Sequence, residues 1–390
     1  MDYSKLSLEM HEKNKGKIEV ISKIKIEDKD DLSTAYTPGV AEPCKEIHKD
    51  KTNAYRYTSK GNLIGVITDG SAVLGLGNIG GIAGMPVMEG KAILFKEFGN
   101  VDAVPIILDT QDTDEIVKTI INIAPTFGGI NLEDISAPRC IEIENRLKEV
   151  LDIPVFHDDQ HGTAIVVTAA IINALRVVNK KVEDVKVVIN GSGAAGGAIL
   201  KMLRAINISN IIVCDSKGII YRGNPSNNWF KNELAEISNL ENIQGTLEDA
   251  IVGADIFVGV SKGNVLTEEM VGKMNGDSIV LAMANPVPEI FPDEAKKAGA
   301  RVIGTGRSDF PNQINNLLAF PGVFRGALDA RASEINYDMN IAAAYAIANM
   351  VKADELGEEY IIPSALNKDV AVNVAKAVEK AARETGVARV

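Results

Sequence analysis

Apolar positions in the first part of the chain form short branched runs separated by stretches with helical spacing. Side chains branched at Cβ pack well on a pleated surface, so the runs at 63–68, 92–95 and 101–108 predict strands. Apolar residues that recur three and four positions apart predict helices over 114–123 and 141–150. This alternation is typical of an α/β domain.

The beginning of the chain differs from this pattern. Its first 25 residues are rich in charge and predict a helix followed by a linking segment. Two prolines and a glycine then interrupt regular structure over 34–43, and irregular segments of this kind often carry chemistry. Together these segments predict an N-terminal α/β domain over residues 1–155.

A second alternation of apolar runs begins after residue 156. Small and aliphatic residues predict a helix over 163–178, and strands and helices then follow in turn. The predicted strands are 185–190, 211–214, 254–259, 278–284 and 301–304, and the predicted helices are 194–205, 340–355 and 367–384. This pattern predicts a parallel, doubly wound sheet with helices on both faces, followed by C-terminal helices, over residues 156–390.

Composition places the chain among ordinary globular proteins. Hydrophobic residues make up 46% of the 390 residues and charged residues 24%, a balance that favours a buried core over disorder. The longest apolar stretches, such as 164–174, contain polar residues and fall short of the roughly 20 residues that span a bilayer. The segment Met1–Lys5 lacks the basic start of a secretion signal. We therefore expect a cytoplasmic protein that does not bind a membrane.

Cysteines and net charge exclude other classes. Cys44, Cys140 and Cys214 are widely spaced and odd in number, which fits neither a disulfide framework nor a metal site, so we expect them to be buried. The formal net charge of −12 argues against a nucleic-acid partner, because binding to phosphates needs clustered lysine and arginine. A local positive site can still bind a small anion in an acidic protein.

The strongest local motif is a glycine-rich turn between a predicted strand and a predicted helix. Its residues are Gly191, Ser192, Gly193, Ala194, Ala195 and Gly196. The first glycine permits a tight turn, the second lets backbone N–H groups approach a pyrophosphate, and the third allows the helix to pack on the strand. Asp215 ends the next predicted strand, where a carboxylate can accept hydrogen bonds from an adenosine ribose. The motif predicts a Rossmann-type domain that binds a dinucleotide.

The identity of this dinucleotide stays open between NAD and NADP. Asp215 favours a free 2′-hydroxyl, whereas Ser216 and Lys217 directly after it could accommodate a 2′-phosphate. A second Gly-x-Gly-x-x-Gly sequence spans 75–80, but further glycines and Pro86 follow it and are unfavourable in a crossover helix. We interpret this second motif as a loop that closes on a substrate or on a nicotinamide ring.

Two acidic pairs stand at the ends of predicted elements. They are Glu133 with Asp134, and Asp158 with Asp159. Carboxylates suit hard cations such as Mg²⁺ or Mn²⁺, which leave coordination positions open for a substrate. Acidic pairs are more often solvated, so either pair alone would be weak support for a metal site.

Zinc is the competing interpretation for this region. His157 and His161 stand four positions apart, as two zinc ligands on one helix face would. The predicted strand before His157, together with Gly162, argues against a continuous helix there. We therefore favour a carboxylate-only cation site.

Several further blocks occur in an order that resembles one enzyme family. A tyrosine beside a proline, or a lysine before an apolar run, would carry no information alone. The blocks are 36–40 (Tyr-Thr-Pro-Gly-Val), 75–80, 85–91 (Met-Pro-Val-Met-Glu-Gly-Lys), 132–134, 156–164 (Phe-His-Asp-Asp-Gln-His-Gly-Thr-Ala), 191–196, 284–286 (Ala-Asn-Pro) and 315–325. With these blocks the chain resembles the short prokaryotic malic enzymes over nearly its whole length.

The resemblance implies an activity and a set of roles. Malic enzymes oxidise and decarboxylate (S)-malate to pyruvate and CO₂ while reducing NAD or NADP. The resemblance implies that Glu133, Asp134 and Asp159 bind Mg²⁺ or Mn²⁺, that Lys91 is the general base and that Tyr36 is the general acid.

Further roles concern the surroundings of the base and the substrate. Asp158 would orient Lys91, whose pKa we expect to be lowered so that it can act as a base. Asn285, Asn315 and Asn316 would hydrogen-bond the substrate carboxylates and the nicotinamide ribose. The longer malic enzymes have an arginine that grips malate where this chain has Ala72, so other groups must bind the carboxylate here. The candidates are the amides of 75–80 and the asparagines.

Two other functions remain as alternatives. A malolactic-type enzyme would share these motifs but would return the hydride to give lactate, without net production of reduced coenzyme. A non-catalytic, nucleotide-sensing Rossmann protein is also compatible with the fold. The resemblance further implies a homodimer or a larger even homo-oligomer, in which Tyr36 serves either its own site or a neighbour's.

Overall fold

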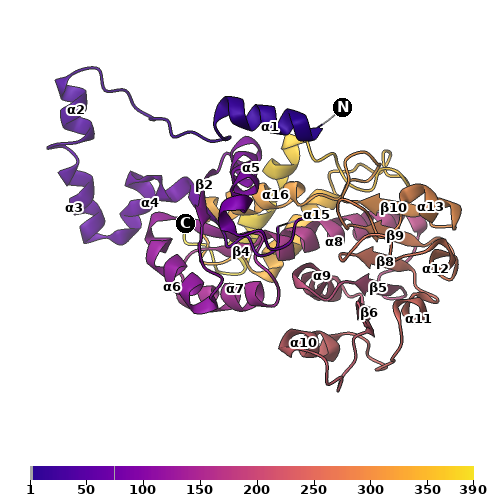
Figure 1. Ribbon diagram of the computed structural model, residues 1–390. Coiled ribbons are helices and arrows are strands. Elements are labelled where there is room, and N and C mark those ends of the chain that lie inside the picture. Colours follow the sequence, from indigo (N-terminus) through magenta and orange to yellow (C-terminus); the bar gives the residue numbers. More distant parts are fainter. Residues whose placement is uncertain (1–2, 74) are drawn as a thin grey trace.

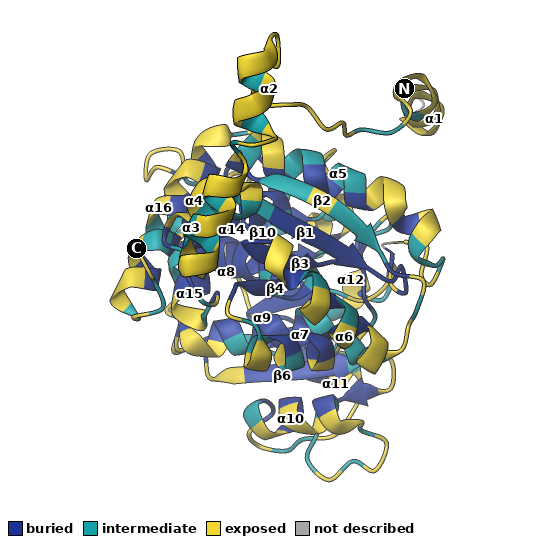
Figure 2. Cartoon of the chain, turned by 90° about the vertical axis from the view of Figure 1, so that its left-hand side faces the viewer, coloured by how far each residue is buried: buried dark blue, intermediate teal, exposed yellow. Residues whose placement is uncertain are grey.

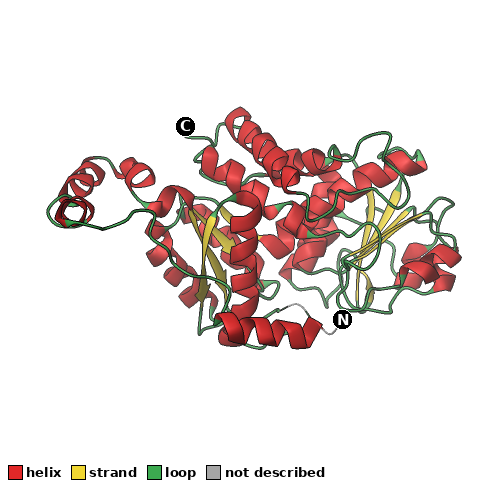
Figure 3. Cartoon of the chain, turned by 90° about the horizontal axis from the view of Figure 1, so that it is seen from above, coloured by secondary structure: helices red, strands yellow, loops and turns green. Residues whose placement is uncertain are grey.

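The computed structural model describes residues 3–73 and 75–390. It contains two sheets with α-helices packed around them, and Figure 3 shows the sheets separated by helices. The first sheet is entirely parallel and has the strand order β2-β1-β3-β4. Its strands are β1 (Leu63–Thr68), β2 (Asp102–Ile107), β3 (Gly129–Leu132) and β4 (Val155–His157). The predicted domain boundary between residues 155 and 156 falls within β4 and stays a prediction.

Three α-helices and one short 3-10 helix connect the strands of the first sheet. They are α5 (Gly81–Gly99), α6 (Thr113–Ile123), η3 (Ala124–Thr126) and α7 (Arg139–Val150). The predicted strand at 92–95 is wrong, because these residues lie inside α5. The same helix contains Pro86, which local preference disfavours. Buried side chains such as Phe95 hold α5 on the body, so tertiary packing outweighs local preference here.

The second sheet has six strands in the order β10-β9-β8-β5-β6-β7. They are β5 (Lys186–Asn190), β6 (Asn210–Asp215), β7 (Gly218–Ile219), β8 (Ile256–Gly259), β9 (Ile279–Ala282) and β10 (Val302–Thr305). All pairs are parallel except β6 with the short β7. The chain leaves β5 toward β6 on one side and later returns to β8 on the other. Ligands bind at such a reversal of strand order, so the predicted α/β fold also indicates where to look for the site.

Helices pack around the second sheet and continue to the C-terminus. They are α8 (Asp158–Val178), α9 (Ala194–Ala205), α10 (Trp229–Ile237), α11 (Leu247–Ile251), α12 (Glu268–Gly272), α13 (Pro292–Lys297), η4 (Asn316–Leu318), α14 (Phe320–Asp329), α15 (Tyr337–Ala348) and α16 (Lys368–Glu384). The helix predicted to end at residue 355 ends at Ala348. The Asn173 side chain satisfies this helix end, because it donates to the backbone oxygens of Ala348 and Ile361 at 2.8 and 2.9 Å.

Helix α8 is the central helix of the protein. It begins at Asp158, earlier than the predicted 163, and passes through Gly162. By length and composition α8 could cross a membrane, although the sequence pattern predicted no such segment. However, 78% of its most apolar window is buried inside the protein, and core helices of globular proteins have the same property. Figure 2 shows the buried residues concentrated in the sheets and the helices around them.

An aromatic cluster joins α5 and α14 to the first sheet. The ring centroid of Phe95 lies 4.6 Å from that of Phe320 and 5.3 Å from that of Phe324, in edge-on geometry. Phe156 of β4 packs on Phe324 at 5.7 Å. Edge-on aromatic pairs of this kind contribute about 0.5–1.5 kcal/mol each beyond their buried area. The cluster therefore fixes the helix that carries Lys91.

The N-terminal region forms an arm, defined here as residues 18–53. It follows α1 (Tyr3–Asn14) and contains α2 (Lys29–Ala35), α3 (Ala41–Lys49) and η1 (Lys51–Asn53). The chain then returns to the body through α4 (Ala54–Tyr57) and η2 (Ser59–Asn62). Figures 1 and 3 both show α2 and α3 standing away from the body.

The arm also changes two expectations. The segment 34–43, predicted to be irregular, contains the end of α2 and the start of α3, with a turn between them. Cys44 lies on α3 and is exposed, so the expectation that it is buried was wrong. Cys140 and Cys214 are buried as expected.

Candidate active site

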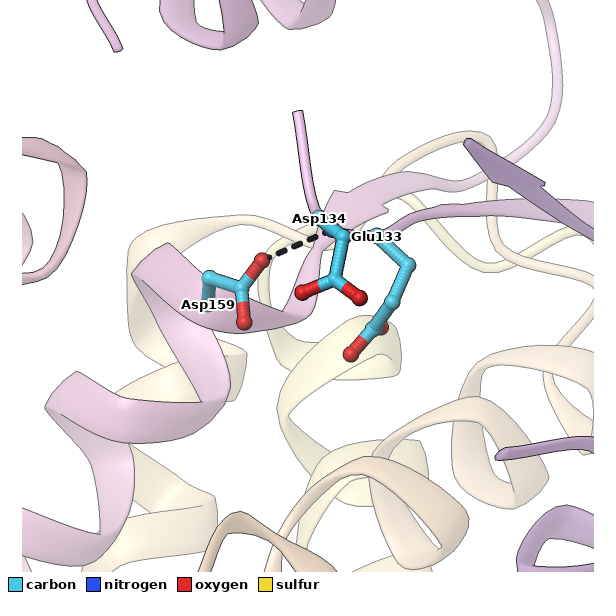
Figure 4. Close-up of side chains that lie close together, drawn as sticks. All are labelled: Glu133, Asp134 and Asp159. Carbon is cyan, nitrogen blue, oxygen red and sulfur yellow. Dashed lines mark hydrogen bonds between the residues drawn. The ribbon is translucent and has the colours of Figure 1, made fainter. Parts of the chain in front are cut away.

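Three carboxylates meet at the carboxyl edge of the first sheet. Glu133 and Asp134 directly follow β3, and Asp159 lies in the first turn of α8, directly after β4. Because β3 and β4 are parallel neighbours, the residues that follow them lie at the same edge. One oxygen from each carboxylate lies within 4.8 Å of the others, and Figure 4 shows the three side chains converging. The structure thus brings together the three predicted metal ligands.

The backbone of Asp134 is held in a left-handed conformation, with φ of 53°. Its N–H donates to Oδ2 of Asp159 at 2.9 Å, drawn in Figure 4, and its carbonyl oxygen accepts from the N–H of Ala72 at 2.9 Å. A left-handed residue other than glycine costs about 1 kcal/mol or more. These two hydrogen bonds offset that cost and keep the Asp134 carboxylate beside Asp159.

Burial and mutual repulsion raise the pKa values of this cluster. Burial raises the pKa of Glu133 to about 7. Burial and then the charge of Asp159 raise the pKa of Asp134 to about 8, and burial also raises the pKa of Asp159. Oδ2 of Asp134 is buried and accepts no hydrogen bond from the described residues. A divalent cation would supply the missing positive charge, so this donor set fits Mg²⁺ or Mn²⁺.

Lys91 reaches the cluster from α5. Its Nζ lies 2.8 Å from Oε1 of Glu133, 2.6 Å from Oδ2 of Asp158 and 4.3 Å from the centre of the Phe320 ring. Burial alone would lower the pKa of Lys91, but the charges of Asp158 and Glu133 outweigh it and raise the pKa. The expectation that burial lowers this pKa was therefore wrong, because it did not include the two carboxylates. Lowering of the pKa by a nearby cation stays a prediction.

The predicted polar residues around the base divide into two groups. Asp158 is fully buried beside Lys91, and the Asn316 amide donates to its Oδ2. Asn285, Asn315 and Asn316 all lie on the wall of a neighbouring cavity. The side chain of Asn315 also accepts the N–H of Leu317 at 2.9 Å and so caps η4.

A cavity of about 590 Å³ opens beside the carboxylates. Asp134 and Asp159 form part of one wall, and Ala194, Ala195 and Asn285 form part of another. The cavity therefore lies between the two sheets, with possible cation ligands on one side and the predicted dinucleotide loop on the other. Ala72 and Gly75 also line it, so the second glycine motif reaches the same space.

The glycine turn has the geometry that its motif predicts. A Cβ atom at Gly191 would lie 2.6 Å from the carbonyl oxygen of Val260, and one at Gly196 would lie 1.8 Å from the carbonyl oxygen of Gly191. Neither position can hold a side chain. Gly193 meets nothing within 4 Å and provides no side-chain cap for α9. The first N–H groups of α9 are thus not capped by Gly193, and such groups bind phosphate.

A second cavity, of about 600 Å³, lies beside Asn190, the last residue of β5 before this turn. Asp215, Ser216 and Lys217 line it, and Ser261 and Lys262 line both cavities. The two spaces therefore adjoin, as an extended dinucleotide requires. Oδ1 of Asp215 accepts the N–H of Lys217 at 2.7 Å. Its other oxygen, Oδ2, accepts a hydrogen bond from Nζ of Lys231 on α10 at 2.5 Å.

Tyr36 does not join these residues within the chain. It is the C-cap residue of α2 on the arm, its exposed fraction is 68%, and it is not among the residues that line either cavity. Of the predicted residues it is the one that the structure leaves apart from the site.

The two histidines have separate environments. His157 ends β4, is fully buried and has a pKa lowered by burial to about 4. His161 lies on α8 with Nε2 2.8 Å from Oε1 of Glu144, which is also 2.8 Å from Nζ of Lys148. Nε2 of His161 is thus already paired with Glu144, and His157 lies in a separate buried environment, so this arrangement does not favour a zinc site.

Sequence reasoning missed two residues that shape the site. Glu289 is fully buried, and its two oxygens accept the N–H groups of Ser261 and Ala284, each at 3.0 Å. It thus ties together the loops that follow β8 and β9. Lys262 supplies positive charge where the two cavities meet. Neither residue stands in a recognisable motif, so contacts made only in the folded protein identify them.

Comparison with known proteins agrees with this geometry. The protein-family model for the malic enzyme N-terminal domain matches residues 15–148. The family model for the malic enzyme NAD-binding domain matches residues 160–383. The chain is 58% identical to the bifunctional malic/malolactic enzyme of Bacillus subtilis (strain 168), over 98% of this chain and 94% of that protein. It is 59% identical to the NAD-dependent malic enzyme of Geobacillus stearothermophilus, over 96% of this chain and 78% of that protein.

A solved structure extends the likeness to three dimensions. The malic enzyme from Pyrococcus horikoshii superposes with a TM-score of 0.96 and 51% sequence identity, covering 99% of this chain and 92% of that one. The two family models together match most of the chain, and the matched regions contain Lys91, Glu133 and Asp134 as well as the glycine turn. The chain belongs to the malic enzyme family.

Proposed function

We propose that this protein oxidises (S)-malate at C2 and removes its C4 carboxylate as CO₂, leaving pyruvate and reducing NAD or NADP. One observation carries the proposal. A buried lysine, Lys91, lies within 2.8 Å of carboxylate oxygens beside a three-carboxylate cluster, and this group borders a cavity whose other wall includes the glycine turn. The arrangement supports a base, a cation and a nicotinamide ring acting on one small molecule.

Glu133, Asp134 and Asp159 would hold Mg²⁺ or Mn²⁺. When bound, such a cation supplies Lewis acidity toward the substrate's oxygen atoms. The cluster's raised pKa values support this role, because three crowded carboxylates that share one neighbouring lysine retain protons near neutral pH.

Lys91 would act as the general base in the oxidation step. Its neighbour Asp158 has a pKa raised by burial to about 7 and lies 2.6 Å from Nζ. Lys91 must release its proton before it can act as a base, and a cation held by the carboxylate cluster would favour this release, because a second positive charge nearby lowers the pKa of an ammonium group. Neutral Lys91 then takes the proton of the C2 hydroxyl as the C2 hydrogen leaves as hydride for the nicotinamide ring. Asn316, bonded to the same carboxylate, holds Asp158 in place.

Tyr36 would act as the general acid after decarboxylation. Oxidation at C2 gives a β-keto acid, and cleavage of its C3–C4 bond releases CO₂ and leaves the electron pair in an enolate. The hydroxyl of Tyr36 would donate a proton to C3 to form pyruvate. Asn285 and Asn315 on the cavity wall would bind the substrate carboxylates in place of an arginine at position 72.

A malolactic reaction is the second candidate function. It is favoured by the bifunctional malic/malolactic name of the Bacillus subtilis relative. The experiment that separates the two measures absorbance of the reduced nicotinamide with malate, Mn²⁺ and either coenzyme. Net reduced coenzyme together with pyruvate supports the proposal, whereas lactate without net reduced coenzyme supports the malolactic reaction. Coenzyme binding without any turnover would support a sensor instead.

We further propose that the protein forms a homodimer or a larger homo-oligomer with an even number of chains. The exposed apolar residues of the arm support this. The absence of nucleic-acid and membrane partners, and the cytoplasmic location, stay predictions.

A further inference from the structure

A lysine stands where the two cavities meet. The residues common to both linings are Ser261 and Lys262, in the loop that follows β8. One cavity reaches Asp215, where the adenosine ribose is expected, and the other reaches the carboxylates and Asn285. The pyrophosphate joins the two nucleosides of a dinucleotide. A coenzyme that extends through both cavities therefore places its pyrophosphate beside Lys262.

The side chain of Lys262 is free to bind a ligand. It is exposed, and it makes no hydrogen bond or ion pair with any residue that the structure describes. Two other lysines near the cavities differ in this respect. Lys91 pairs with Glu133 and Asp158, and Lys231 pairs with Asp215. An anion can thus bind Lys262 without breaking an existing contact.

The cavity beside the carboxylates has little positive charge of its own. Asp134 and Asp159 line it, and Lys262 is the one lysine or arginine in its lining, within the part of the chain that the structure describes. A pyrophosphate carries two negative charges. The N–H groups at the start of α9 supply only partial positive charge, so a full charge from Lys262 complements them.

The loop that carries Lys262 is fixed beside the glycine turn. The N–H of Ser261 donates to the buried Glu289 at 3.0 Å. The carbonyl oxygen of Val260 lies so close to Gly191 that a Cβ atom there would be 2.6 Å away. The backbone next to Lys262 is therefore held against the turn, and only the lysine side chain has to move to reach a ligand on it.

We infer that Lys262 binds the pyrophosphate of NAD or NADP from the loop after β8, while the N–H groups at the start of α9 bind the same pyrophosphate from the glycine turn. The inference rests on the coenzyme of the proposed function and adds a residue to its binding site. Two other anions compete for this lysine, the carboxylates of malate and the 2′-phosphate of NADP. The experiment separates all three.

The test measures the binding of ADP-ribose, which carries the pyrophosphate but has neither a nicotinamide ring nor a 2′-phosphate. Lys262→Met keeps a long side chain and removes its charge. Calorimetric titration should show that ADP-ribose and NAD both bind about tenfold more weakly, because a hydrogen bond to a charged group contributes at least that factor. Added salt should weaken binding less in Lys262→Met than in the wild type, because the variant lacks a screened charge. Lys262→Arg should restore most of the affinity.

The matched control is Lys297→Met, which removes the same charge elsewhere. Lys297 is an exposed lysine of α13 that pairs with Glu268, outside both linings. Its replacement should leave the affinity for ADP-ribose unchanged. Because Lys262 is exposed, the thermal midpoint of Lys262→Met should equal that of the wild type, and Lys262→Gln provides a second uncharged variant.

Three results would overturn the inference. The first is an unchanged affinity for ADP-ribose in both uncharged variants. The second is a higher KM for malate with that affinity unchanged, which would assign Lys262 to the substrate. The third is weaker binding of NADP alone, which would assign it to the 2′-phosphate. A wild-type chain that binds ADP-ribose but turns over no malate would instead refute the proposed function and leave the binding result for Lys262 intact.

Discussion

Nζ of Lys91 lies 2.6 Å from Oδ2 of Asp158, although the two residues are 67 positions apart and both are buried. The pair joins the helix α5 to the first residue of α8. A buried ion pair is retained only where its surroundings compensate for lost hydration. Here Glu133 and the Phe320 ring provide that compensation on the lysine side. The pair therefore fixes the base at the edge of the cavity.

Replacing this lysine should abolish malate oxidation. Lys91→Ala removes the general base, and a lost general base typically costs 10²–10⁴-fold in rate, so kcat should fall by about 10³-fold. Steady-state kinetics with malate, Mn²⁺ and coenzyme measure this. Lys96→Ala is the matched control, because Lys96 lies on the same helix but is half exposed and pairs with Asp102. Equal activity of the two variants would rule out Lys91 as the base.

Acidity should weaken the effect of a cation on stability. The folded protein holds protons on Glu133, Asp134 and Asp158, whose pKa values are raised to about 7 or 8, whereas the unfolded chain has released them by about pH 6. Stability without added cation should therefore fall as the pH rises from about 6.5 to about 8. His157, with its pKa lowered to about 4, has the opposite effect only below about pH 6.5.

Added Mn²⁺ should reverse that fall. Because the cation binds deprotonated carboxylates, it should raise the thermal midpoint more at pH 8 than at pH 6.5. Scanning calorimetry with Mn²⁺ and with EDTA measures the difference, and Asp159→Asn should remove most of it. A Mn²⁺ effect that is the same at both pH values would show that these carboxylates are not the ligands.

Two substitutions in the glycine turn should have different effects. Gly196→Ala would place a methyl group 1.8 Å from the Gly191 carbonyl oxygen, so the free energy of unfolding should decrease by at least about 2 kcal/mol. Gly193→Ala meets nothing within 4 Å, so stability should change by less than about 1 kcal/mol. Its methyl group should nevertheless weaken coenzyme binding, because it stands where the pyrophosphate approaches. Denaturation and calorimetric titration test the two effects, and equal stability loss in both variants would contradict them.

Local signals made much of the fold predictable. The strand at 63–68 and the helix at 194–205 coincide with β1 and α9, because branched runs and a glycine turn act over a few residues. The residues 92–95 were misassigned because four apolar residues do not separate a strand from a buried helix. Only the contact of Phe95 with Phe320 distinguishes the two, and that contact spans more than half of the chain.

The site was predictable for a different reason. Glu133, Asp134 and Asp159 follow parallel neighbouring strands, so their meeting follows from topology once the strands are assigned. The raised pKa of Lys91 was not predictable, because it depends on two carboxylates placed within 3 Å by tertiary packing. Glu289 has no motif at all, and only its two backbone donors reveal its role.

Tyr36→Phe should impair one half-reaction more than the other. Without the hydroxyl the enolate lacks its proton donor, so exchange of pyruvate C3 protons with solvent should fall by about 10²-fold or more. Hydride transfer, which depends on Lys91, should fall less. NMR in D₂O measures the exchange and absorbance measures the hydride step, with Tyr57→Phe as a control on a neighbouring exposed tyrosine. Wild-type exchange in Tyr36→Phe would exclude it as the general acid.

The most direct measurement follows malate labelled with ¹³C at C4, in the presence of Mn²⁺ and each coenzyme in turn. We predict labelled CO₂, unlabelled pyruvate and reduced coenzyme in equal amounts with at least one of the two coenzymes. All three products should be lost when EDTA removes the cation. Labelled CO₂ with lactate and no net reduced coenzyme, or no labelled CO₂ with either coenzyme, would contradict it.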